Sequence, residues 1–96
     1  MPSSTARVAT DAAGRYAKQL ASHLGRRIQV RDRPGGGFHL TLQAGEGVLV
    51  PEPTRLVMHA TAPDPETLAT VQDVLGSHLE RFGRRNELIV TWEDDE

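Results

Sequence analysis

The chain has 96 residues, and 11 Lys and Arg against 13 Asp and Glu leave a net charge of −2 with neutral histidines. This length predicts one domain over residues 1–96, with one core and no room for a deep enclosed cavity as well. The absence of cysteine excludes disulfides, zinc–thiolate sites and thiol chemistry, and the charge balance argues against a nucleic-acid binder, which usually shows a basic excess.

The hydropathy of the chain argues against a membrane protein. No apolar run approaches the ~18–20 residues that a membrane helix needs, and residues 1–7 lack the apolar stretch of a signal peptide. We therefore expect a cytoplasmic protein that is not associated with membranes.

Residues 4–10 alternate small or apolar side chains with polar ones, which predicts a short first strand. Thr10 or Asp11 supplies a side-chain oxygen for the amides of a helix start. Apolar residues then recur at steps of three and four, and Gly25 is suited to ending a helix. The pattern predicts a first helix over about 11–24.

The middle of the chain predicts four strands in succession. Residues 27–31, 38–43, 48–50 and 55–61 are the predicted strands, with a turn at 34–37. Pro51 and Pro53 stop the third of these four strands, because proline cannot donate a ladder hydrogen bond. Short turns between consecutive strands indicate an antiparallel meander.

Asp64, Pro65 and Glu66 form a strong helix start, since they supply a cap, a first-turn proline and a favourable charge at the positive end of the helix dipole. Apolar side chains then step by three or four residues as far as Phe82, and Gly83 ends the helix. Gly76 costs about 1 kcal/mol relative to Ala inside a helix, which close packing against a bulky neighbour such as Trp92 would explain. Residues 87–92 predict a last strand, and the acidic tail, residues 93–96, is expected to fray.

The predicted order is β-α-β-β-β-β-α-β. Two helices that are apolar on one side must bury that side on the sheet, and the outward residues of every strand are polar or mixed. We expect an α+β fold, a two-layer sandwich with a mostly antiparallel sheet, both helices on one face and the other face open.

Two of the four histidines are candidates for a metal site. His23 and His78 lie at the rims of the two apolar helix faces, so they would approach each other if the helices run side by side. The alternative for His78 is a histidine at the core edge whose ring bonds a backbone carbonyl. His39 and His59 are outward strand residues whose Cα atoms would lie ~9–10 Å apart, which favours solvated histidines over shared metal ligation.

The remaining candidates are anion sites and nucleophilic dyads. Arg81, Arg84 and Arg85 form the best anion- or partner-binding cluster, with Arg26 and Arg27 as possible neighbours; the alternative is that they only complement a helix C-terminus. Residues 35–37 are three glycines that indicate a hairpin tip, because a phosphate loop needs a following helix. Adjacent Ser-His pairs point apart on a helix and do not predict a catalytic dyad.

Four stretches carry a family resemblance: STARVAT at 4–10, YAKQLASH at 16–23, VQDVLGSHLERF at 71–82 and LIVTW at 88–92. Together they resemble the bacterial family catalogued as domain of unknown function 2218, and the run from His78 to Phe82 is the most specific part. The resemblance implies an uncharacterised function with an association with iron- or siderophore-related genes. It also implies a cysteine before the first Ser-His pair, where this chain has Ala21, so a thiol or thiolate–metal role is in doubt.

The residues favour a non-catalytic binding or accessory module without a cofactor, acting through the open sheet face or a groove between the helices. A protein partner or a homodimer fits this hypothesis equally well. The alternative is a metal- or iron-linked protein, catalytic or not, that uses His23 and His78 with a carboxylate. Nucleic-acid binding by the open sheet is a third alternative, which the charge disfavours.

Overall fold

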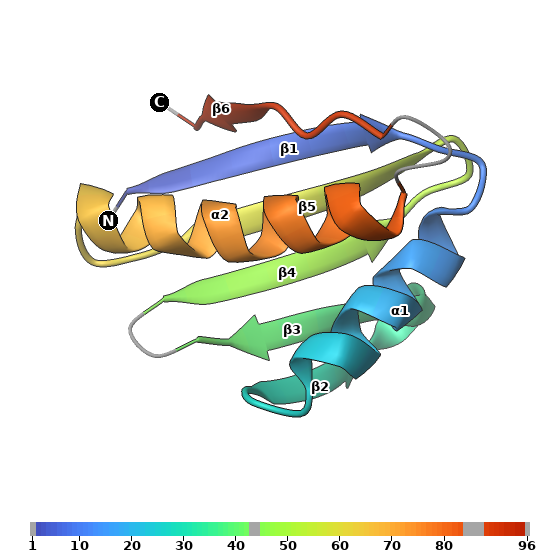
Figure 1. Ribbon diagram of the computed structural model, residues 1–96, viewed down its shortest axis with the longest axis horizontal. Coiled ribbons are helices and arrows are strands. Elements are labelled where there is room, and N and C mark those ends of the chain that lie inside the picture. The colour runs from blue at the N-terminus through green and yellow to red at the C-terminus, as the bar shows by residue number, and fades with distance from the viewer. Residues whose placement is uncertain (1, 43–44, 84–87, 96) are drawn as a thin grey trace.

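The computed structural model describes residues 2–42, 45–83 and 88–95. Its elements in chain order are β1 (Ser3–Ala9), α1 (Ala13–Leu24), β2 (Gln29–Arg33), a 3₁₀ turn (Pro34–Gly36), β3 (Gly37–Thr41), β4 (Glu46–Pro51), β5 (Arg55–Thr61), α2 (Pro65–Phe82) and β6 (Trp92–Asp94). The six strands form one sheet in the order β2-β3-β4-β5-β1-β6, and every pair of neighbours is antiparallel. Both helices cover the same face (Figure 1). The predicted α+β fold and the order of its elements are confirmed.

The core lies between the helices and the inward residues of the central strands. Inward and outward residues alternate along each strand, so Ala6, Val8, Leu49, Leu56 and Met58 pack beneath the helices while the residues between them face outward. The apolar stripes of the helices complete this core with Leu20, Leu24, Leu68, Val71, Leu75 and Leu79. Within residues 2–42, 45–83 and 88–95, no helix is long and apolar enough to cross a membrane.

The second helix begins and ends where its sequence predicts. Asp64 Oδ1 accepts a hydrogen bond of 2.7 Å from the Thr67 amide, and Pro65 occupies the first turn. A Cβ built on Gly76 would lie 3.2 Å from Trp92 Nε1, so the predicted packing of this glycine against Trp92 is confirmed.

Two predicted boundaries near α1 are displaced. The helix begins at Ala13 rather than residue 11, because the Thr10 hydroxyl accepts from the Ala12 amide before the helix starts. Strand β2 begins at Gln29 rather than residue 27, since the amides of Arg27 and Ile28 still bond to the Leu24 carbonyl at 3.0 Å. In the turn that follows β2, Gly35 and Gly36 both have φ of 84°, a conformation that favours glycine.

The C-terminal predictions need the largest correction. Leu88 packs against Gly83, and the Val90 amide donates to Glu80 Oε2 at 3.0 Å, so these residues lie against α2 and the last strand begins only at Trp92. The predicted fraying of the tail is wrong for residues 93–95: Glu93 and Asp94 pair with β1, and the Asp95 amide donates to the Ser3 carbonyl. The tail closes an edge of β1 that would otherwise lack a hydrogen-bonding partner. Glu87 and Gln43, which were predicted in strands, fall outside the described residues.

Candidate functional site

The two helices bring His23 and His78 together. His23 lies in the last turn of α1 and is exposed, whereas His78 lies near the end of α2 and is half-buried. Their ring centroids are 5.1 Å apart, and the ring planes are inclined by 45°. The sequence predicted that these two histidines would approach each other if the helices run side by side, and the structure shows this contact.

Phe82 completes this contact, which we call the histidine cluster (His23, His78 and Phe82). Phe82 follows His78 by one helical turn, and its ring meets that of His23 edge-on with centroids 5.3 Å apart. Phe82 therefore limits how far the exposed His23 ring can turn away from His78. The sequence analysis assigned Phe82 only to the core.

A backbone hydrogen bond defines the proton position on His78. Its Nδ1 lies 2.6 Å from the Val74 carbonyl oxygen, one turn earlier on α2. A carbonyl can only accept, so Nδ1 carries the proton and the lone pair of the neutral ring is on Nε2. The predicted core-edge bond to a backbone carbonyl is present, and it leaves Nε2 available to a ligand.

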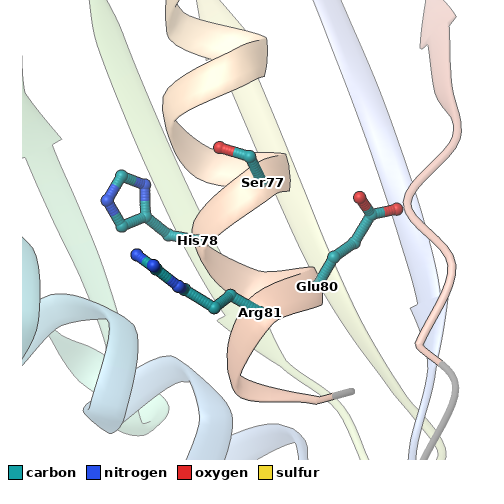
Figure 2. Close-up of a pocket in the computed structure, with 4 residues that line it drawn as sticks. All are labelled: Ser77, His78, Glu80 and Arg81. Carbon is teal, nitrogen blue, oxygen red and sulfur yellow. The ribbon is translucent and has the colours of Figure 1, made fainter.

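A cavity of about 450 Å³ opens beside this cluster and is lined by Ser77, His78, Glu80 and Arg81. Figure 2 shows His78 and Arg81 on the same side of α2, whereas Glu80 points to the other side. Glu80 is held there by the Val90 amide. Arg81 is exposed and has no ion pair within the part of the chain that the structure describes, so its guanidinium is not paired with the Glu80 carboxylate that also lines the cavity.

The remaining predicted residues divide into two groups. Arg84 and Arg85 lie outside the described residues, so their relation to Arg81 is not defined. The Ser77 hydroxyl donates to the Asp73 carbonyl at 2.5 Å and makes no dyad with His78. Among residues 2–42, 45–83 and 88–95, no group of three or more His, Cys, Asp or Glu side chains is arranged to hold a metal ion.

The open sheet face holds a hydrogen-bonded chain that the sequence analysis missed. Thr5 Oγ1 donates to Asp95 Oδ1 at 2.7 Å and lies 3.0 Å from His59 Nδ1. The hydroxyl has one proton, and it donates this proton in the hydrogen bond to the carboxylate. His59 Nδ1 must therefore be the donor in its hydrogen bond with Thr5. His59 is thus half-buried and hydrogen-bonded rather than freely solvated. Its partner Thr5 lies 54 positions earlier in the sequence, and no local pattern indicates this contact.

The second outward histidine is separate from this chain of bonds. In the strand register, Val48 lies between His59 and His39, and His39 Nε2 lies 3.6 Å from Glu46 Oε1. The two imidazoles are therefore on different strands with a valine between them, as the meander predicts.

Comparisons with known proteins agree with the fold. Residues 5–93 match the model of a family described as "Uncharacterized protein conserved in bacteria (DUF2218)". A similar solved structure is the NMR structure of PA4090 from Pseudomonas aeruginosa, with 29% sequence identity, a TM-score of 0.81, and coverage of 97% of this chain and 96% of that chain. No curated protein matches the chain. These matches assign no function.

Proposed function

We propose a function for this chain, which belongs to the bacterial family DUF2218 of uncharacterized proteins: it is a non-catalytic binding module that holds an anionic small molecule beside His78 and Arg81. The observation that carries the proposal is the cavity of about 450 Å³ that these two side chains line from one side of α2. Small-molecule sites usually measure about 300–1,000 Å³, so the cavity suits a compact metabolite.

The chemistry of the lining favours a carboxylate or a phosphate. The Arg81 guanidinium presents parallel N–H donors that match two oxygens of either group. His78 adds Nε2, which donates to an anion when the ring is protonated. Glu80 also lines the cavity, but it accepts from the Val90 amide instead of pairing with Arg81, so the guanidinium remains available to an anion.

Isothermal titration with inorganic phosphate and with citrate tests this proposal. We expect Arg81→Gln to weaken binding about tenfold or more, because a hydrogen bond to a charged group contributes about 1.5–3 kcal/mol. Arg15→Gln is the matched control, since Arg15 is also an exposed arginine but lies in the first turn of α1, at the end opposite His23. Equal binding by the wild type and Arg81→Gln, or no binding of either anion by the wild type, would refute the anion site.

A second candidate is a divalent metal ion held by His23 and His78. It is favoured by the contact of the two rings and by the bond from His78 Nδ1 to Val74, because metal-ligating histidines usually donate their other ring N–H to such an acceptor. The ion would need further ligands from water or from a bound molecule.

Native mass spectrometry with added Fe²⁺ and Zn²⁺, run on the same proteins, separates the two candidates. Stoichiometric metal that is lost in His23→Ala and His78→Ala but kept in Arg81→Gln would support the metal site. If the wild type has a metal-free mass with Fe²⁺ and also with Zn²⁺, the metal site is rejected and the anion proposal is unaffected.

A further inference from the structure

The sheet face opposite the helices separates its charges along the strands. Three acidic side chains lie where β1 begins and β5 ends: Glu46, Glu93 and Asp95. We call this region the acidic end. A fourth acidic residue, Glu52, follows β4 at the other end of the strands, where it is paired with Arg55. Outward arginines Arg7, Arg33 and Arg55 lie toward the opposite end of the strands, which we call the basic end. Arg31 is the exception, because it lies level with Glu93 at the far edge of the sheet.

The strand register defines how these charges follow one another. One outward row runs from Glu93 through Thr5, His59, Val48 and His39 to Arg31, and so crosses all six strands. The next row toward the basic end contains Arg7, Val57 and Val50. The centre of the open face is therefore apolar, and the charged groups surround it.

The central valines are more covered than an open face requires. Val57 points away from the helices yet is only 5% exposed, and Val48 and Val50 are half-buried. Val57 has little area left to bury, so the apolar area that a second protein surface can cover is mainly that of Val48 and Val50.

We propose that this face binds the same face of a second copy of the chain, with a two-fold axis that runs across the strands through the valine strip. A closed dimer needs a self-complementary surface, and this axis reverses the strand direction while keeping each strand opposite its own copy. The basic end of one copy then lies over the acidic end of the other. Arg7 then lies over Thr5 of the second copy, one strand away from its Glu93, and Arg55 lies over Thr61, one strand away from Glu46.

The free charges favour Arg7 and Glu93 as the principal pair. Neither residue has an ion-pair partner among the residues that the structure describes, whereas Arg55 is already paired with Glu52 at 2.6 Å and Glu46 with His39. Asp95 remains ionised, because hydrogen bonds from Thr5 and Ser3 hold the pKa of its carboxyl below the usual value. Arg7 of the same chain is one of the smaller causes of this lowered pKa, so Asp95 and a partner's Glu93 both attract this arginine.

The size of the face predicts a weak dimer. Six strands about 4.8 Å apart, the longest about 23 Å, present roughly 600 Å². A standard stable interface buries ~800 Å² per partner. Because much of the complementarity comes from exposed charges, the association should weaken as salt screens them.

Sedimentation velocity over a range of protein concentrations in low salt tests the dimer with a charge exchange. We expect the wild type to show a reversible monomer–dimer equilibrium, and Arg7→Glu and Glu93→Arg each to shift it to monomer, because each places like charges close to each other twice. An equimolar mixture of the two variants should dimerise again, since each copy then supplies the charge that the other needs. Arg15→Glu makes the same charge change on the helix layer and should sediment as the wild type does.

Three results would overturn the proposal: a wild type that stays monomeric, a dimer that neither single variant weakens, or a mixture that fails to recover it. A monomeric wild type that is captured by another protein through this face would overturn it as well. If a variant does not fold, the wild type still carries the test, because a dimer that persists unchanged in high salt contradicts the charge pairing. Phosphate binding beside His78, on the opposite face of the sheet, should be unaffected in both variants.

Discussion

The Thr5 hydroxyl joins three parts of the sheet that are distant in sequence. It lies on β1, donates to Asp95 beyond β6 and accepts from His59 on β5, and its residue is only 4% exposed. Replacing it with an isosteric apolar side chain should leave the packing intact and remove both bonds.

We expect Thr5→Val to lower the free energy of unfolding by about 1 kcal/mol, the usual net value of such hydrogen bonds, with some loss offset by water at the exposed carboxylate. Thr5→Ser keeps the hydroxyl and is the control. Urea denaturation followed by circular dichroism measures both. A Thr5→Val protein as stable as Thr5→Ser would show that the hydroxyl contributes nothing.

The same pair of proteins should differ in how stability depends on pH. The hydrogen bond from Thr5 is the largest cause of the lowered pKa of Asp95, ahead of that from Ser3. A carboxyl whose pKa is lower in the folded state stabilises the fold fully above its unfolded value, which is near 3.8, and loses that contribution as the pH falls through the folded value. The advantage of the wild type over Thr5→Val should therefore be constant near neutrality and shrink in acid.

These bonds also show why the sequence misjudged the tail. Four consecutive acidic residues at a chain end suggest solvation, and that expectation depends only on local composition. The partners that order Asp95 are Ser3 and Thr5, about 90 positions earlier, and nothing in the acidic run points to them. The partner of His59 is also distant, 54 positions earlier, so the sequence did not indicate its hydrogen bond. His23 and His78 were identified because helix periodicity places both at the rims of the apolar helix faces.

At the element scale, Gly45 and Gly14 differ in the space around them. Gly45 precedes β4, and a Cβ there would lie 2.6 Å from Val71 Cγ2 and 2.9 Å from the Thr61 carbonyl oxygen. Gly14 lies in the first turn of α1 with nothing within 4 Å of such a Cβ. The first glycine permits α2 to approach the sheet, and the second serves no packing purpose.

The same substitution should therefore have opposite effects at the two positions. Gly45→Ala should destabilise the protein by about 1–3 kcal/mol, the usual cost of overpacking, because the Thr61 carbonyl belongs to a central strand that cannot move aside. Gly14→Ala should stabilise it by up to about 1 kcal/mol through helix propensity. Thermal unfolding of both variants gives the signs directly, and a neutral Gly45→Ala would mean that α2 shifts without cost.

Periodicity predicted the elements better than their pairing. The three- and four-residue steps in α2 gave the bounds of that helix, since its apolar face is buried along its whole length. The alternation in residues 88–92 is equally regular, yet Leu88 and Val90 satisfy it by packing against α2 rather than in a ladder. An alternating pattern indicates which side chains are buried, but not whether a strand or a helix covers them.

The edge strand β2 and the central strand β5 differ in pairing and in exposure. Strand β2 pairs only with β3, and four of its five residues are exposed, including Arg31 and Arg33. Charged side chains on an edge strand discourage pairing with another sheet. Strand β5, by contrast, lies between β4 and β1 beneath the helices, and its inward residues are fully buried.

Amide hydrogen exchange should reproduce this arrangement. We expect the slowest exchange in β5 and β1, whose amides are released only by global unfolding, and the fastest in β2 and β6, which can open locally. Exchange measured at two protein concentrations also distinguishes the proposed dimer from a dimer formed by joining sheet edges. A dimer through the open face leaves the free edge of β2 as it is, so the exchange of β2 amides should not depend on concentration. Slower exchange in β2 at high concentration would indicate edge pairing and contradict the proposed face-to-face dimer.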